Sequence, residues 1–290
     1  MKTVVIAAGY ATRLGELTRN FPKPLLQIGS STILGRMLDD IDSIPGIDEH
    51  IIVTNGKFAE IFEDWASRRA ASGRLSSESF ASLHPSRSLS PKVGGPLPFT
   101  RPRAATDSEK SRPEAACTVK PITVLSDGTF TNETRLGAVC DLLFAMEKLR
   151  LDDDLLVVAA DNILEFSFRG FVEYAKQKGT SCIMCHHEPE IYKLQRTGVI
   201  EVDEDMKVLQ MQEKPEVPVS HWAVPPFYVY LRKDLDLVRH SVENGCGRDA
   251  PGNLAHYLVD RTTLHAWKMP GGRFDIGSLD TYEEAKIKYA

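Results

Sequence analysis

The sequence lacks any apolar run that approaches the roughly 18 residues of a membrane-spanning helix. No apolar secretory segment precedes its first strand-like run, so we expect a soluble cytoplasmic protein without membrane association. An excess of positive charge is missing too, because 35 Lys and Arg face 40 Asp and Glu, a net charge of −5. This balance argues against general nucleic-acid binding.

Cysteine is scarce, with only five among the 290 residues. Cys182 and Cys185 form a C-x-x-C pair, but no second cysteine pair completes a set of zinc ligands. The stretch 180–185 is typical of a buried strand, which favours core thiols over a metal site. His186 and His187 follow directly, so a metal site stays open as the alternative. The small number of cysteines is typical of a protein from a reducing compartment.

Two common phosphate-binding motifs are absent, the Gly-x-x-x-x-Gly-Lys-Ser/Thr loop and the Gly-x-Gly-x-x-Gly fingerprint. The start of the chain offers a different arrangement. Residues 3–7 are apolar and β-branched, which predicts a buried strand, and the small residues at 7–12 predict a turn behind it. Backbone N–H groups of such a turn can approach phosphate oxygens closely.

Two cations follow this turn. Arg13 ends it, and Lys23 comes later between Pro22 and Pro24, which stiffen the backbone on both sides. A strand, a phosphate-sized turn and two cations suit phosphoryl or nucleotidyl transfer, in which catalysis depends on positioning and charge neutralisation. The alternative is an ordinary turn of an α/β protein with solvated surface charges.

Strand-like and helix-like segments alternate along the rest of the chain. This alternation predicts an α/β fold with a mostly parallel sheet and helices on both faces. The predicted strands are 3–7, 50–54, 122–125, 155–160, 180–185 and 264–269, and an alternating pair covers 195–203 and 208–212. The predicted helices are 32–44, 57–69, 136–149, 167–178, 232–242, 249–259 and a last one that Ser278 caps and that ends at Tyr289.

One segment, at about 70–118, breaks the pattern. It is rich in Ser, Pro, Arg and Gly, has few apolar residues and carries an excess of positive charge. Such a segment buries too little surface to offset the entropy lost on ordering. We therefore expect a mostly disordered, basic insertion in a single domain of residues 1–290. A tolerated surface insertion or a gene-model artefact is favoured over a partner-binding or phosphorylation-controlled arm.

The most hydrophobic predicted strand, 155–160, ends in Asp161 and Asn162. Open parallel sheets bind ligands at the carboxyl ends of their strands. Mg²⁺ prefers one or two carboxylates together with phosphate oxygens, so Asp161 is a candidate metal ligand. The alternative is a loop aspartate or a helix cap.

Residues 7–25 resemble the signature of the sugar-1-phosphate nucleotidyltransferases, the family that includes glucose-1-phosphate thymidylyltransferase. The family pattern is roughly Gly-Gly-x-Gly-Thr-Arg-Leu, about ten residues, then Pro-Lys-Pro. Ala8 and Ala11 replace two of these glycines, with Tyr10 between them, and alanine is expected to exclude positive φ and to narrow the phosphate cradle. The matching residues are Gly9, Thr12, Arg13, Leu14, Pro22, Lys23 and Pro24.

Later segments match the family in the same order. Leu136, Gly137 and Ala138 resemble a loop that lies against the nucleobase, where Gly137 would let a flat base approach the backbone. Asp161 and Asn162 resemble the end of a strand whose aspartate binds Mg²⁺. These matches imply a nucleotide half at the start of the chain.

The second half of the chain carries two further matches. Gly198 and then Glu213-Lys214-Pro215 resemble a segment that holds the sugar phosphate, and Trp222 stands where thymidylyltransferases tend to have a tyrosine near the sugar. Residues 273–278 resemble Trp-x-Asp-x-Gly-Thr/Ser, with arginine at the tryptophan position and Asp275 at the second Mg²⁺ ligand. No hexapeptide repeats follow, so we expect the appended acyltransferase domain of some relatives to be absent.

The resemblance implies a Rossmann-like three-layer fold and a nucleotidyltransferase that makes an NDP-sugar and pyrophosphate from an NTP and a sugar 1-phosphate. It implies that Arg13 holds the leaving pyrophosphate, and that Lys23 neutralises charge growing on the α-phosphate. The implied nucleotide-binding residues are Ala7, Ala8, Gly9, Thr12, Arg13, Asn132, Leu136 and Gly137. The implied sugar-phosphate residues are Asn162, Gly198, Glu213, Lys214 and Trp222, and the implied Mg²⁺ ligands are Asp161 and Asp275.

Two other functions stay open. One is a catalytically weak regulatory or scaffold relative that binds nucleotide sugars, suggested by the alanines at glycine positions and by the insertion. It is opposed by the presence of Arg13, Lys23, Asp161 and Asp275, since a pseudoenzyme is expected to have lost one of them. The other is transfer to a non-sugar phosphate such as phosphocholine. The sequence does not choose the base, the acceptor or the oligomeric state, a homo-oligomer included.

Overall fold

The structure is a computed structural model, and it describes residues 1–72 and 119–290. Nearly all of the insertion predicted at about 70–118 lies outside these residues. Its first residues, 70–72, belong to the end of a helix.

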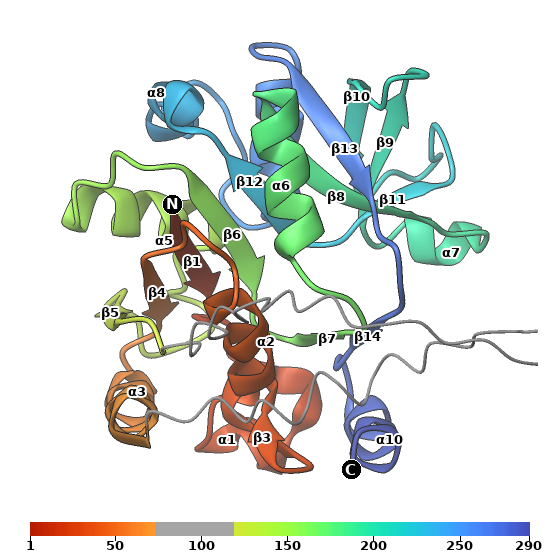
Figure 1. Cartoon of the computed structure of the whole chain (residues 1–290). Helices are drawn as coiled ribbons and strands as arrows, with labels where there is room; N and C mark the ends of the chain where they lie inside the picture. The colour runs from red at the N-terminus through yellow and green to blue at the C-terminus, as the bar shows by residue number, and fades with distance from the viewer. Residues whose placement is uncertain (73–118) are drawn as a thin grey trace, which may run out of the picture.

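A ten-stranded mixed sheet forms the centre of the molecule, with the order β10-β9-β11-β8-β12-β6-β1-β4-β5 and with β13 paired to β8 (Figure 1). Strands β6, β1, β4 and β5 run parallel, as does the β13–β8 pair. The strands are β1 Lys2–Ile6, β4 Glu49–Thr54, β5 Ile122–Ser126, β6 Leu155–Ala159, β8 Ser181–His187, β9 Gly198–Val202, β10 Val208–Glu213, β11 Trp222–Val224, β12 Phe227–Tyr230 and β13 Leu264–Lys268.

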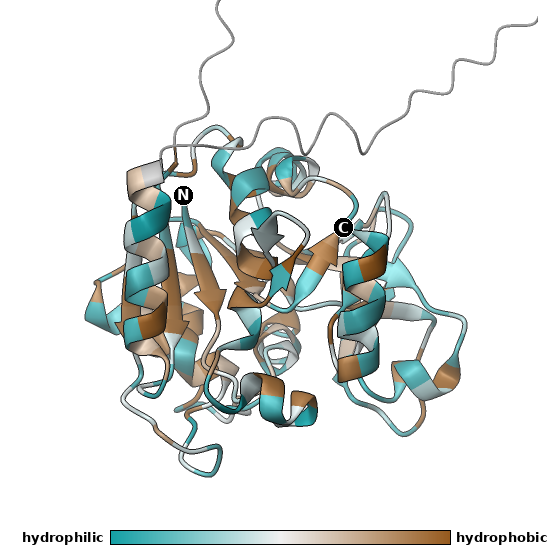
Figure 2. Cartoon of the chain, turned by 90° about the horizontal axis from the view of Figure 1, so that it is seen from below, coloured by the Kyte–Doolittle hydropathy of each residue, from teal (hydrophilic) through white to brown (hydrophobic). Residues whose placement is uncertain are grey.

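Helices cover both faces of this sheet, because each strand turns alternate apolar residues to opposite sides. Val4 packs in one core with α5 (Ala138–Lys148), α8 (Leu235–Arg239) and α9 (Gly252–Val259). The next residue, Val5, packs in the other core with α2 (Ile33–Asp42), α3 (Ala59–Ser72) and α6 (Arg169–Lys178). Figure 2 shows the hydrophobic strands enclosed by helices that are hydrophobic on one side only. The predicted three-layer Rossmann-like fold is confirmed.

The remaining helices and strands are short, and the sequence pattern did not predict most of them. Strand β7 (Asn162–Leu164) pairs with β14 (Arg273–Asp275), and β2 (Gln27–Ile28) pairs with β3 (Ser31–Thr32). The predicted helix 232–242 is wrong in extent, since only η3 (Arg232–Asp234) and α8 form there. The other short helices are η1 Thr12–Leu14, α1 Glu16–Arg19, η2 Lys23–Leu25 and α7 Ile191–Leu194.

The last helix, α10 (Leu279–Lys288), is capped by Ser278 as predicted. Ser278 and Thr281 form a reciprocal capping box, which satisfies two N–H groups at the start of the helix. Tyr282 and Tyr289 of this segment pack with Leu26 and Ile28 near the start of the chain. The C-terminal helix therefore packs against the segment around residues 26–28.

Cys182 and Cys185 are buried, free thiols in β8. Burial raises the pKa of Cys182 to about 11 and that of Cys185 to about 12, so both stay protonated. Within residues 1–72 and 119–290, no three His, Cys, Asp or Glu side chains gather as a metal site. The prediction of core thiols is confirmed.

None of the helices in the described ranges has the length and apolar character needed to cross a bilayer.

Candidate active site

The turn after β1 carries one residue in a left-handed conformation. Ala11 has φ 47° and ψ 39°, just before η1. Its carbonyl accepts hydrogen bonds from the N–H of Leu14 and from the hydroxyl of Thr18. The expectation that alanine excludes positive φ is therefore wrong at Ala11. These two hydrogen bonds help to hold a conformation that costs an alanine roughly 1–2 kcal/mol.

We expect Ala11→Gly to raise the free energy of unfolding by up to about 1 kcal/mol, because glycine adopts this conformation without strain. Chemical denaturation of the two proteins measures the change. The matched control is Ala8→Gly in the same turn, where φ is not positive and the side chain is buried. That variant should lose stability, and a loss of similar size at Ala11 would contradict the strain at this position.

Lys23 and Asp161 form an ion pair at the carboxyl ends of β1 and β6. The ammonium Nζ lies 3.0 Å from Oδ2 of Asp161, and Lys23 is only 8% exposed. The 3₁₀ turn η2, with Pro22 before it and Pro24 inside it, fixes the backbone of Lys23. The other oxygen of Asp161, Oδ1, accepts a hydrogen bond of 2.6 Å from the Asn162 amide. Both oxygens of this carboxylate are therefore oriented.

Asp275 reaches the same place from the end of the chain. In the β7–β14 pair Asp275 lies opposite Asn162, and the N–H of Ile276 donates to the carbonyl of Asp161 over 3.1 Å. Asp275 keeps contact with solvent, but the surrounding protein, and then the charge of Asp161, raise its pKa. Two carboxylates that repel each other in this way fit a divalent cation, which would bind both.

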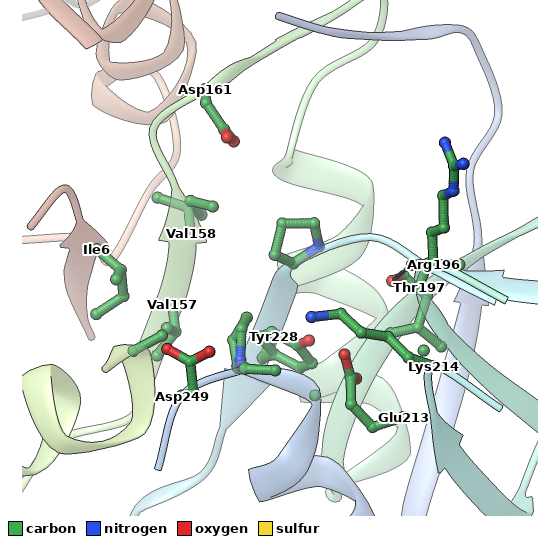
Figure 3. Close-up of a pocket in the computed structure, with 18 of the residues that line it drawn as sticks. Ile6, Val157, Val158, Asp161, Arg196, Thr197, Glu213, Lys214, Tyr228 and Asp249 are labelled. Atoms are coloured by element: carbon green, nitrogen blue, oxygen red, sulfur yellow. Dashed lines mark hydrogen bonds between the residues drawn. The ribbon is translucent and has the colours of Figure 1, made fainter. Parts of the chain in front are cut away.

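A cavity of about 390 Å³ begins beside Asp161 and continues toward β9, β10 and the start of α9. Figure 3 shows Asp161 at one end and Glu213, Tyr228 and Asp249 at the other, with Lys214 pointing inward between them. The predicted site residues on its wall are Arg13, Asp161, Gly198, Glu213 and Lys214. The wall residues that the sequence did not suggest include Ile6, Val157, Arg196, Thr197, Tyr228, Asp249 and Gly252.

Two glycines make room for the Glu213 side chain on this wall. A Cβ at Gly252 would overlap Oε2 of Glu213, and a Cβ at Gly198 would lie 3.4 Å from the same oxygen. The carboxylate thus lies against the first residue of α9, where the helix dipole favours a negative charge. Burial nevertheless raises the pKa of Glu213, and the nearby Lys214 opposes that rise.

Gly252→Ala is expected to raise the KM of a substrate bound in this cavity about tenfold or more, because the new methyl group would displace the Glu213 carboxylate from its place on the wall. Alanine at a helix position would by itself stabilise the protein, so the unfolding temperature should not fall sharply. Steady-state kinetics with Glu213→Gln and with the double variant provide the comparison. Independent, multiplicative effects of the two changes would show that Gly252 does not act through Glu213.

Gly137, the predicted base contact, lies against the backbone of residues 248–249. Gly137 has φ 92°, and a Cβ there would lie 2.8 Å from Cα of Asp249. The N–H groups of Ala138 and Val139 donate to the carbonyls of Asp249 and Arg248. The backbone at 248–249 therefore occupies the space that a side chain at residue 137 would need, and the base contact stays a prediction.

Other predicted residues lie away from the 390 Å³ cavity. Thr12 and Asn132 line a separate hollow of about 400 Å³, together with Tyr10 and Phe130. Ala7 and Ala8 are buried, Gly9 is exposed and Leu136 is half-buried. Because Ala7, Ala8 and Gly9 form the turn beside Arg13, their backbone remains a candidate for phosphate binding.

Two predicted sugar contacts are not on the cavity wall. Asn162 is only 2% exposed, and its amide is occupied by hydrogen bonds within the protein. Trp222 packs edge-on against His187, and the Lys268 ammonium lies 4.7 Å from the centre of its ring. Neither residue lines this cavity, and the sugar contacts of Asn162 and Trp222 stay predictions.

A lysine–aspartate pair at the carboxyl end of β6, with a second aspartate on the adjoining β14, lies where open α/β sheets bind ligands. A model of the nucleotidyl transferase family matches residues 2–93 and 102–290, and the chain belongs to this family.

Two relatives with assigned functions match the chain along almost its whole length. Glucose-1-phosphate adenylyltransferase of Fervidobacterium nodosum is 21% identical over 287 residues, 98% of this chain and 60% of the relative. UTP–glucose-1-phosphate uridylyltransferase AglF of Haloferax volcanii is 20% identical over 295 residues, 99% of this chain and 95% of the relative. The chain thus spans about 60% of the adenylyltransferase and nearly all of the uridylyltransferase.

A solved structure of UDP-glucose pyrophosphorylase with UDP-glucose has a TM-score of 0.71 and 19% identity to this chain. The match covers 99% of this chain and 97% of the pyrophosphorylase chain. A likeness at this identity confirms the fold.

Proposed function

We propose that this protein transfers a nucleotidyl group from an NTP to a sugar 1-phosphate, giving an NDP-sugar and pyrophosphate. The observation that carries the proposal is the Lys23–Asp161 pair beside Asp275, at the mouth of a cavity that continues to Glu213 and Lys214. The family membership and the sugar-1-phosphate nucleotidyltransferases among the relatives support it. The free thiols of the described residues agree with a cytoplasmic location.

In the proposed reaction an oxygen of the sugar phosphate attacks the α-phosphorus of the NTP, and the bond to the β-phosphate oxygen breaks. Pyrophosphate leaves, and no general base is needed because the attacking phosphate is already ionised. Lys23 would balance the negative charge that grows on the α-phosphate, and Arg13 would hold the pyrophosphate. Lys214 would receive the acceptor phosphate, and Glu213 would accept hydrogen bonds from sugar hydroxyls.

Asp161 and Asp275 would hold a Mg²⁺ ion, for which their donor set is suitable. Such an ion supplies charge neutralisation between the nucleotide and acceptor phosphates.

The test is pyrophosphate release from a matrix of nucleoside triphosphates and phosphate acceptors, with and without Mg²⁺. The acceptors are several sugar 1-phosphates and phosphocholine. Release with one NTP–sugar pair, lost on addition of EDTA, would establish the function. Release with phosphocholine alone would change the acceptor class. Saturable binding of an NDP-sugar without release from any pair would point to a regulatory relative.

We propose further that residues 1–290 are one nucleotidyltransferase domain, interrupted by an insertion at about 70–118. The flanks of this segment meet at one carboxylate, which supports the proposal. Arg69 lies 2.8 Å from Oδ2 of Asp42, and the N–H of Lys120 donates to its Oδ1 over 2.9 Å. Nε2–H of His50 donates to the same Oδ1 over 2.9 Å, in a site closed to solvent.

Replacing residues 73–118 with a short Gly-Ser linker is expected to change the unfolding temperature by no more than a few degrees and the turnover number by no more than about twofold. The reason is that loop length has only a small effect on stability. Thermal unfolding and the pyrophosphate assay measure both quantities. The control removes Asp42 in the shortened chain, which should destabilise it strongly because His50 and the N–H of Lys120 lose their acceptor. An insoluble or inactive shortened protein would contradict a dispensable insertion.

A further inference from the structure

Arg273 lies close to the proposed metal ligands, although it is absent from the wall of the 390 Å³ cavity. It is the first residue of β14, two residues before Asp275. The family that the sequence resembles has tryptophan at this position. Pairing of β14 with β7 places Arg273 opposite Leu164 and so brings its side chain alongside Asn162. A half-buried arginine at this place can influence the site without touching a substrate in the cavity.

A chain of hydrogen bonds leads from Arg273 to Asp161. Nη1 of Arg273 donates to Oδ1 of Asn162 over 2.7 Å. The amide Nδ2 of Asn162 then donates to Oδ1 of Asp161 over 2.6 Å. Lys23 donates to the second oxygen of Asp161 over 3.0 Å. The carboxylate of Asp161 is therefore held by one hydrogen bond at each oxygen.

Arg273 decides which way the Asn162 amide faces. An asparagine amide can present either its oxygen or its NH₂ group in a given direction. Because a guanidinium has donors only, it selects the amide oxygen and leaves the NH₂ group for Asp161. With the amide reversed, its oxygen would face the Asp161 carboxylate, and two acceptors would repel each other.

The same arginine adds positive charge where two carboxylates meet. Asp161 precedes β7 directly and so lies beside Asp275 of β14, while Lys23 forms its ion pair with Asp161. Arg273 provides a second cation on the Asp275 strand. Both oxygens of Asp161 are already oriented and the charges at the site are partly balanced. The site therefore loses little conformational freedom when a cation binds.

We propose that Arg273 is a positioning residue: through the Asn162 amide it orients Asp161 for a divalent cation shared with Asp275. This inference rests on the metal role of Asp161 and Asp275 in the proposed function. It assigns Asn162, the predicted sugar contact, to the support of the metal site instead. It also explains why Asn162 is buried with both ends of its amide bonded.

The test is binding of Mn²⁺ alone to the full chain, followed by electron paramagnetic resonance, because Mn²⁺ prefers the same oxygen ligands as Mg²⁺. Arg273→Gln is expected to raise the Kd of Mn²⁺ about 10- to 100-fold, the usual cost of removing a group that orients a metal ligand. Arg232→Gln is the matched control, since Arg232 is exposed and pairs with Asp152 at 2.5 Å, outside the cavity wall. Its Kd should equal that of the unchanged protein.

A double-variant cycle shows whether Arg273 acts through Asn162. In an Asn162→Ala background, Arg273→Gln should not raise the Kd any further, because the link is already broken. Multiplicative losses in the double variant, or an unchanged Kd in Arg273→Gln, would overturn the proposal. Arg273→Lys, which keeps a donor and the charge, should recover part of the affinity, and it serves as the test if Arg273→Gln does not fold by circular dichroism.

This measurement is independent of turnover. Mn²⁺ binding needs neither the NTP nor the acceptor, so failure of the pyrophosphate assay would leave the positioning role open to the same test. Conversely, unchanged Mn²⁺ affinity in an active Arg273→Gln enzyme would overturn the positioning role and leave the proposed function intact.

Discussion

Lys23→Ala is expected to lower the turnover number by at least about 10²–10³-fold, while NTP binding survives in part. Removing one fixed group that stabilises charge in a transition state typically costs this much. Lys23 is also the ion-pair partner of Asp161 at 3.0 Å, so its loss removes a positive charge in direct contact with that carboxylate. Rapid-quench or steady-state measurement of pyrophosphate release gives the turnover number, and equilibrium titration gives the NTP affinity.

Lys176→Ala is the control for Lys23→Ala. Lys176 is exposed on α6 and makes one long contact of 3.5 Å with the carbonyl of Pro45. Its removal should leave turnover unchanged. Near-normal turnover in Lys23→Ala would exclude the charge-neutralising role and with it the proposed use of this site.

Asp275→Asn should abolish most metal-dependent turnover, again by about 10²–10³-fold, yet it should not destabilise the fold. One of two carboxylates for the cation is lost, while the repulsion between Asp275 and Asp161 disappears. Because Asp275 remains in contact with solvent, the gain in free energy of unfolding should be less than about 1 kcal/mol. Opposite effects on activity and stability are typical of residues kept for function.

The measurements for Asp275→Asn are the Mg²⁺ dependence of pyrophosphate release and thermal unfolding without metal. Asp280→Asn, on the exposed side of α10, is the control and should change neither quantity. A large fall in the unfolding temperature of Asp275→Asn would indicate a structural role for this carboxylate. Unchanged Mg²⁺ dependence would remove Asp275 from the proposed metal site.

The longer helices and strands could be predicted because each spans enough residues to show a repeating pattern of apolar side chains. The run at 3–7 and the helical spacing at 32–44 correspond to β1 and α2 within one or two residues. Asp161 could be found in the same way, since it follows the most apolar strand of a parallel sheet. Local pattern therefore locates the sheet edge and one carboxylate of the site.

Contacts between distant segments could not be predicted from local pattern. Strands β7 and β14 have three residues each, too few to show the alternation of apolar and polar residues that marks a strand. Their pairing nevertheless brings Asp275 to Asn162. Gly252 has meaning only through the Glu213 side chain that lies against it. Ala11 shows a different limit, because the preference for glycine at positive φ is an energy of a few kcal/mol at most, which two hydrogen bonds can offset.

Lys23, Asp161 and Asp275 come from distant parts of the chain, which has a consequence for synthesis. Lys23 and Asp161 are separated by 138 positions, and Asp275 joins them only after the last strand pair has formed. A nascent chain released early, or one trimmed by a protease before β14, would keep much of the sheet but lack a carboxylate of the site. Such fragments would be catalytically silent, so enzyme activity would report full-length, correctly assembled molecules rather than total protein.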